Sequence, residues 1–261
     1  ITMSRDESFE PDDADQLRYK PLSEINPSAI NEALAGLTLL GDDPHLCMQA
    51  MNLGLVDPFI ADLEEELLEK LIDEERTPMP EAIFVSAQSQ MWIFAAYELL
   101  RTWRQRASDM IKWHDNSGLE IKLRTLEEDQ GYQHFGRAYR ASQVRKVIED
   151  PSMISRIRDD LRRVHILFGR LEALRVSLAK HEVRGRSGSV ALAPGYGRIN
   201  HWCGALDYEL ENGRYSMGYV NRRDIADNIR GLLTIGDLPS EEDLASFDEY
   251  MKGPPHDLLD W

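Results

Sequence analysis

The chain has 261 residues and a formal net charge of −16, from 30 Lys and Arg against 46 Asp and Glu. Hydrophobic residues make up 42% of it, which argues against disorder over most of its length and predicts a real core. No apolar run approaches ~18 residues, so we expect no membrane-spanning helix, and the start of the chain lacks the pattern of a secretory signal. Two cysteines give no disulfide framework, and the simplest location is therefore the cytoplasm.

Positive charge is concentrated in the middle third of the chain. Residues 101–186 hold 19 Lys and Arg against 12 Asp and Glu, whereas the remainder holds 11 against 34. Such an asymmetry can locate an anionic partner. The plainer alternative is a set of solvated helix faces without a partner.

The N-terminal part divides into an arm and the first helices. Residues 1–22 are acidic and poor in apolar periodicity, which predicts a flexible arm. A helical bundle is expected over residues 23–186, starting with a short helix from Ser23 to Leu40 in which Ser28 is a candidate cap. Residues 45–76 are expected to form two helices, broken near Asp57-Pro58. The second of them has apolar residues at steps of four: Phe59, Leu63, Leu67 and Leu71.

The strongest helical pattern runs from Glu81 to about His114. Its apolar arc is broad, which places this helix at the centre of the bundle. The arc consists of Ile83, Val85, Trp92, Phe94, Ala96, Tyr97, Leu99, Trp103 and Met110. Residues 119–136 have a mixed pattern that assigns no element, and residues 137–149 are expected to form a further helix.

The sequence Asp150-Pro151 indicates that one helix ends and another begins. The new helix is predicted to run to about His181, with Asp150 as its cap and Pro151 in the first turn. Its apolar seam alternates steps of three and four, as in a packed heptad-like stripe. The seam is Ile154, Ile157, Leu161, Val164, Phe168, Leu171 and Leu178, with Arg175 at the remaining position.

After residue 186 the composition changes. Residues 187–235 are expected to form a loop, a β-hairpin with strands at 202–210 and 215–220, and a short helix in which Asp224 is a candidate cap. Residues 236–261 are expected to be an acidic tail. The predicted fold is therefore mainly α, a helical bundle with a small C-terminal β-hairpin.

The C-terminal region also holds two weaker candidate sites. His201, Cys203 and Asp207 lie close together in sequence, but no second ligand pair completes a zinc site. Arg222 and Arg223, just before Asp224, are candidates to contact an anion at a helix N-terminus, and a capping or surface role is the favoured alternative.

Arg175 and His181 carry the main functional hypothesis. A guanidinium offers bidentate contact to a phosphate, and an imidazole titrates near neutrality. Six residues of helix place the two side chains ~120° apart and ~9 Å along the axis. They therefore share an anion only if the helix frays near His181 or if a second copy supplies the other half.

The stretch LEALRVSLAKHE, at the end of a long amphipathic helix, resembles the signature of HEPN domains, an Arg followed after four to six residues by a His. The resemblance covers about residues 81–185. It implies a metal-independent endoribonuclease of a toxin–antitoxin or antiphage defence system, with its pocket at a homodimer interface and no cofactor. In it, Arg175 would hold the phosphate and His181 would be the general acid or base.

Lys180, Arg184 and Arg186 crowd the same helix end and are predicted to bind the RNA. The pair Arg158 and His165 fits the same spacing and ranks second.

A non-catalytic alternative stays open: a helical interaction or regulatory module that is a subunit of a complex. In that case Arg175 pairs with an acid such as Glu172 and fixes helix packing, and His181 is an exposed helix-end residue. Under the ribonuclease hypothesis, by contrast, residues 101–186 wall a basic cleft, and the acidic flanks shield that cleft or engage a protein regulator.

Overall fold

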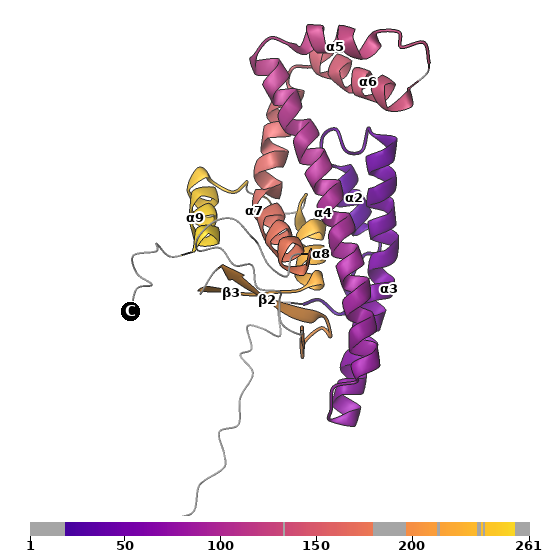
Figure 1. Cartoon of the computed structure of the whole chain (residues 1–261), viewed down its shortest axis with the longest axis vertical. Helices are drawn as coiled ribbons and strands as arrows, with labels where there is room; N and C mark the ends of the chain where they lie inside the picture. The colour runs from indigo at the N-terminus through magenta and orange to yellow at the C-terminus, as the bar shows by residue number, and fades with distance from the viewer. Residues whose placement is uncertain are drawn as a thin grey trace, which may run out of the picture.

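The computed structural model describes residues 19–132, 134–179, 197–212, 215–233, 236 and 238–253. As expected, the fold is mainly α, with a small antiparallel sheet in the C-terminal part (Figure 1). The helices are η1 (Leu22–Glu24), α2 (Ala29–Ala35), α3 (Pro44–Glu74), α4 (Met79–Asp115), α5 (Leu119–Glu127), α6 (Phe135–Glu149), α7 (Met153–Ala179), α8 (Arg222–Gly231) and α9 (Glu241–Lys252), and the strands are β1 (Arg198–Ile199), β2 (Leu206–Asn212) and β3 (Tyr215–Val220).

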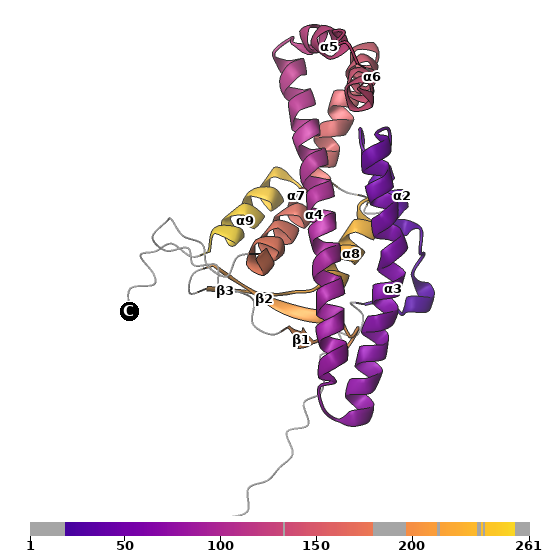
Figure 2. The same cartoon turned by 45° about the vertical axis from the view of Figure 1, so that its right-hand side comes forward.

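The α3–α4 hairpin forms the long axis of the molecule, with α7 on the other side of α4 (Figures 1 and 2). Asp43 caps α3, since its Oδ1 accepts hydrogen bonds from the backbone N–H groups of His45 and Leu46 at 3.0 and 3.1 Å. The predicted break near Asp57-Pro58 is wrong, because α3 continues through Pro58. Pro58 removes one backbone donor, and the buried ion pairs of Asp57 and the packing of this helix on α4 offset that loss.

Helix α4 lies at the centre of the core, as its broad apolar arc predicts. Trp92 and Trp103 are buried, and their indole N–H groups donate to backbone carbonyls of Leu53 and Thr38. Ile83, by contrast, is exposed rather than part of the core. The first turns of α4 lie beside the last turns of α3 at the end of the hairpin, where Lys70 forms an ion pair with Glu81 (Figure 1).

Helices α5 and α6 pack on each other and cross the far end of the α4–α7 pair (Figure 1). Helix α5 occupies the first half of residues 119–136, the segment whose sequence pattern is mixed. Trp113 of α4 lies against both helices, with the Lys122 Nζ 4.9 Å and the Arg140 guanidinium carbon 5.5 Å from its ring centroid.

Helix α7 buries most of its predicted seam, but Arg175 is half-buried, and Leu174 occupies the buried position beside it. The predicted start is wrong by two residues. Asp150 Oδ1 accepts a hydrogen bond from the Ser152 N–H at 3.1 Å, and the helix begins at Met153, so Pro151 precedes it.

The sheet has the order β1-β2-β3, and both pairings are antiparallel. The predicted hairpin is confirmed for β2 and β3, and its turn residues 213 and 214 lie outside the described part of the chain. Strand β2 begins at Leu206 instead of residue 202, because Asn200 Oδ1 holds the backbone N–H groups of Trp202 and Cys203 in a turn. Gly204, with φ of 72°, approaches α3 so closely that a Cβ there would overlap the Glu64 carbonyl.

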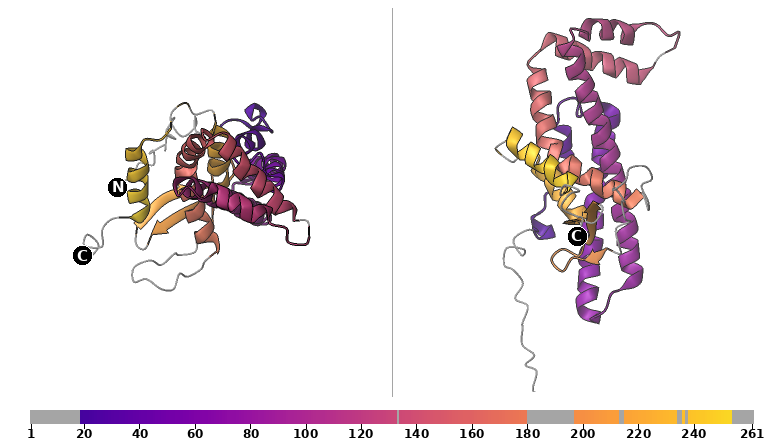
Figure 3. Two further views of the ribbon diagram at one scale, coloured as in Figure 1. Left: turned by 90° about the horizontal axis from the view of Figure 1, so that it is seen from above. Right: turned by 60° about the vertical axis from the view of Figure 1, so that its left-hand side comes forward.

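The cap of α8 is Asn221, not Asp224. The two residues form a capping box in which each side chain accepts a hydrogen bond from the backbone N–H of the other. The predicted tail contains a further helix, α9, which starts with a second capping box of Ser240 and Asp243 and packs beside α7 (Figure 2; Figure 3 shows two further views). None of the described helices combines the length and apolar character needed to cross a bilayer.

Candidate functional site

Arg175 lies on the surface between α4 and α7 rather than inside the bundle. Its side chain is 31% exposed, and its Nη2 is 3.9 Å from Glu98 Oε1. The guanidinium carbon lies 5.0 Å from the ring centroid of Tyr97. The cation is thus loosely paired and stacked on an aromatic ring, in reach of solvent.

Arg175 belongs to a cluster of two cations and two aromatic rings. Tyr97 and Phe168 stack with their ring centroids 5.5 Å apart, and the guanidinium carbon of Arg104 lies 4.0 Å from the ring centroid of Phe168. Burial lowers the pKa of Arg104, which has no ion pair within 4.0 Å among the described residues. Glu172, the predicted partner of Arg175, instead accepts a hydrogen bond from the Tyr97 hydroxyl at 3.1 Å.

His181, Lys180, Arg184 and Arg186 lie outside the described residues, so the predicted meeting of Arg175 with an imidazole stays a prediction. The second-ranked pair is described, and its members bind different partners. Arg158 donates to both carboxylate oxygens of Asp115 at 2.7 and 3.0 Å. His165 lies 2.7 Å from Asp248 of α9. The structure therefore does not bring Arg158 and His165 together over one anion.

A buried ion cluster joins α8 to α3. Arg222 is fully buried and donates to both oxygens of Glu64, at 2.7 and 2.6 Å, and to Asp57. Arg230 also donates to Asp57. Burial disfavours the charge on Arg222, but the carboxylates of Glu64 and Asp57 outweigh it and raise the pKa of Arg222. Each charge of the cluster is therefore paired with an opposite charge, and the buried Nε of Arg230 is the one polar atom of the cluster without a hydrogen bond among the described residues.

Arg223 is buried as well, and its Nη2 donates to the Lys20 carbonyl at 2.8 Å. The surface role predicted for Arg222 and Arg223 is therefore wrong. The sequence did contain a signal for their burial. Asp57 and Glu64 are seven residues apart, so they share one helix face with buried apolar residues, and buried acids demand cations.

Two residues of the weak zinc candidate, Asp207 and Cys203, are placed in environments that do not favour metal binding. Asp207 accepts hydrogen bonds from the side-chain amides of Asn200 and Asn221. Burial raises the pKa of the Cys203 thiol to about 12, which disfavours the thiolate that binds metals. Among the described residues, no group of three or more His, Cys, Asp or Glu is arranged to hold a metal ion.

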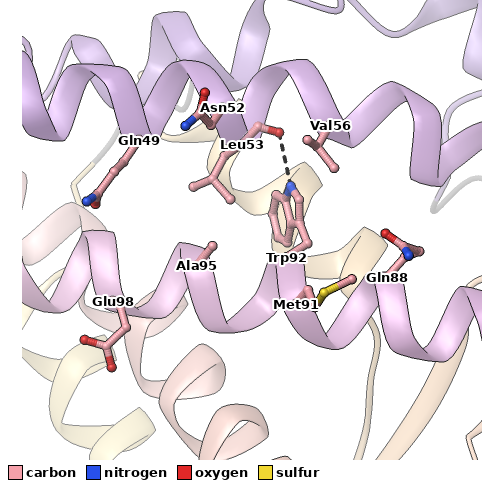
Figure 4. A pocket seen from close by; sticks show the side chains of 9 residues that line it. All are labelled: Gln49, Asn52, Leu53, Val56, Gln88, Met91, Trp92, Ala95 and Glu98. Atoms are coloured by element: carbon pink, nitrogen blue, oxygen red, sulfur yellow. Dashed lines mark hydrogen bonds between the residues drawn. The ribbon is translucent and has the colours of Figure 1, made fainter.

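An apolar groove separates α3 from α4 on the outer side of the hairpin (Figure 4). Its volume is about 510 Å³, enough for a bulky side chain from a ligand. Trp92 and Leu53 are its buried members, joined by the 3.1 Å hydrogen bond from the indole to the Leu53 carbonyl. The remaining lining residues are Gln49, Asn52, Val56, Gln88, Met91, Ala95 and Glu98.

The side of α3 that faces away from the core continues this apolar surface. Within the described structure, Phe59 is 71% exposed, Leu55 61%, Met48 59% and Met51 48%. Met91 of α4 is exposed on the far rim of the groove. Single exposed apolar residues are ordinary, but a contiguous run of them beside a groove is typical of a protein-binding surface.

We compared the chain with protein-family models, curated proteins and solved structures, and none of them matches it.

Proposed function

We propose that the chain is a non-catalytic helical interaction module, a subunit that binds a helix of another protein on the outer side of its α3–α4 hairpin. The observation that carries the proposal is the groove with its adjoining run of exposed Met48, Met51, Leu55 and Phe59. A partner helix that lies along the groove buries its own apolar stripe between α3 and α4. Binding of an amphipathic helix in an apolar groove is a common mode of peptide recognition.

Two further features support a binding role over a catalytic one for the described residues. The best-buried charges, Arg222 with Asp57 and Glu64, pair with one another and leave no group free for chemistry. The groove itself is lined by apolar, amide and small side chains, with Glu98 as its single ionisable member. Such a lining suits a side chain of a partner better than a reacting substrate.

The test is site-specific photo-crosslinking in the native cell, with a photoreactive amino acid placed at Leu55. We expect crosslinks to one partner protein, mapped by mass spectrometry to a helical segment of it. The matched control is the same amino acid at Ile121 of α5, which is equally exposed but lies far from the groove. Phe59→Glu should abolish the crosslink from position 55 while the circular dichroism spectrum stays unchanged. Equal crosslinking from positions 55 and 121, or insensitivity to Phe59→Glu, would refute the proposal.

A metal-independent ribonuclease of HEPN type, acting as a homodimer, is a second candidate. One observation favours it: Arg175 is in reach of solvent, and Arg101 and Arg104 lie around the same two aromatic rings and Glu98. Guanidinium groups in that arrangement suit an RNA phosphate. The general acid or base of this candidate is His181.

The ribonuclease candidate is tested by incubating purified chain with bulk RNA in EDTA. If it is right, Arg175→Ala and His181→Ala each abolish cleavage, whereas Arg158→Ala, which removes only the surface pair with Asp115, leaves it intact. Equal activity of all four proteins, or no cleavage by wild type, rejects the ribonuclease and leaves the interaction module.

A further inference from the structure

We propose that the partner helix is amphipathic with two unlike halves, one apolar and one basic, and that it binds along the whole outer face of α3. This inference rests on the proposed interaction function and adds the chemistry of the partner. The outer face of α3 is the run of residues, at steps of three and four, that points away from the core: Met48, Met51, Leu55, Phe59, Asp62, Glu66, Glu69 and Asp73.

The outer face changes character halfway along the helix. Its first four residues are large and apolar, and the last four are carboxylates. All eight side chains are exposed. No ion pair within 4.0 Å engages any of the four carboxylates in the described part of the chain, and the one lysine of α3, Lys70, pairs with Glu81 of α4. One half of the face therefore offers contact area, and the other half offers unpaired negative charge.

A partner that matches both halves carries apolar residues at helical spacing, followed by Lys or Arg at the same spacing. Apolar contacts beside the groove supply affinity, and the charges fix the direction in which the helix lies. A large apolar side chain of the partner fits the groove between Trp92 and Val56 (Figure 4). Met48 and Met51 of the outer face, and Met91 of the groove, have flexible side chains that adapt to helices of different shape.

A second copy of this chain does not match the outer face. Parallel pairing of two α3 helices brings the acidic halves together, and like charges in contact are repulsive. Antiparallel pairing places the acidic half of each copy against the apolar half of the other, which buries unpaired carboxylates. Charge complementarity thus selects a basic partner over self-association.

The test is a selection with a displayed library of helical peptides about 26 residues long, which span the ~39 Å of the outer face at 1.5 Å per residue. Full-length wild type is the bait, and a Leu55→Glu/Phe59→Glu variant is the bait for counter-selection. We expect enriched peptides with an apolar stripe in one half and Lys or Arg in the other. The selected peptides should bind a Glu66→Lys/Glu69→Lys variant with an affinity about tenfold or more lower than their affinity for wild type at low salt. At high salt this difference in affinity should be much smaller.

The outcomes separate the partner chemistry from the proposed function. Enriched peptides that are apolar but neutral or acidic, or that bind the Glu66→Lys/Glu69→Lys variant as well as wild type, overturn the basic partner and leave the docking function in place. Failure to enrich any peptide over the counter-selected variant overturns both. A wild-type bait that is itself a dimer at low salt, and becomes a monomer on Phe59→Glu, identifies the occupant as a second copy and also overturns the inference.

Discussion

Arg222 links the C-terminal part of the chain to α3 through carboxylates that no solvent reaches. Its guanidinium donates to both oxygens of Glu64 through Nε and Nη2 and to Asp57 through Nη1, and the Trp92 ring centroid lies 5.5 Å away. Bringing these charges into the interior is costly, and only their mutual pairing offsets that cost. The removal of one member should therefore be far more damaging than the removal of a surface pair.

We expect Arg222→Met to reduce the free energy of unfolding by about 3 to 5 kcal/mol, because it leaves Glu64 buried without its cation and leaves Asp57 with Arg230 alone. Urea titration followed by circular dichroism measures the change. Arg76→Met is the control, since Arg76 pairs with Glu74 on the surface and its loss should not be measurable. Adding Asp57→Asn and Glu64→Gln to Arg222→Met should recover part of the loss. Equal stability of Arg222→Met and Arg76→Met would show that the cluster does not support the fold.

Cys203 should be unreactive in the folded protein at ordinary pH. Its folded-state pKa of about 12 lies above the usual value of 9.0, so at pH 8 the thiol keeps its proton and the nucleophilic thiolate is nearly absent. We expect iodoacetamide at pH 8 to leave Cys203 unmodified in the native chain and to alkylate it fully in urea, as measured by peptide mass spectrometry.

The raised pKa of Cys203 also lowers the free energy of unfolding at high pH. Above pH 9 the unfolded chain loses the Cys203 proton that the folded chain retains, so this contribution to stability is present below pH 9 and is lost between pH 9 and 12. Cys203→Ala should therefore lose less stability over that range than wild type. An identical loss in both proteins, or rapid native alkylation of Cys203, would contradict the buried protonated thiol.

At the scale of the elements, periodicity located most helices but misassigned which face of α3 is buried. Steps of four residues rotate about 40° per step around a helix, so Phe59, Leu63, Leu67 and Leu71 do not stay on one face. The structure buries Leu67 and exposes Phe59, and it places Asp57 and Glu64 on the buried side. The distant arginines that pair with these two acids decide the orientation, and they lie outside any local pattern.

Candidate sites were less predictable than helices and strands, because they depend on contacts between residues that are distant in sequence. The spacing of Arg175 marks it as a seam residue, yet Leu174 is buried in its place and Arg175 stacks on Tyr97 from α4. Likewise α9 begins at a clear capping box, Ser240 with Asp243, but its acidic composition concealed it. Local signals such as caps could have been found, whereas contacts between distant helices could not.

The packing of α9 on α7 depends on one glycine. A Cβ at Gly169 would lie 2.6 Å from the ring of Phe247, so any larger side chain must displace that ring. We expect Gly169→Val to release α9, with faster amide hydrogen exchange over Glu241–Lys252, while α3 and α4 keep their protection. The control Gly118→Ala lies at a turn where a Cβ meets only ordinary contacts, and it should leave α9 protected. Unchanged exchange in α9 of Gly169→Val would show that Phe247 does not hold it.

Over the whole molecule, many cations of the basic middle third form ion pairs within the fold. Among the described residues, their partners include Glu127 of α5, Glu241 of α9 and, just before α3, Asp42 and Asp43. Such pairs lower the positive potential that an anionic partner would meet. The acidic half of the α3 outer face has no such pairing among the described residues, which leaves it as a source of negative potential next to the apolar groove.

This arrangement predicts a salt-dependent oligomeric state. At low salt the carboxylates Asp62, Glu66, Glu69 and Asp73 should keep two outer faces apart, so the chain should be monomeric. High salt reduces the Debye length to ~3 Å at 1 M, which screens this repulsion and lets the apolar halves associate. Light scattering at rising salt should show growth in mass for wild type and for Ile121→Glu, but none for Phe59→Glu. A dimer at low salt that Phe59→Glu does not affect would place the contact between two copies elsewhere. The ribonuclease candidate requires such a contact, because its pocket is shared by two copies at the end of α7.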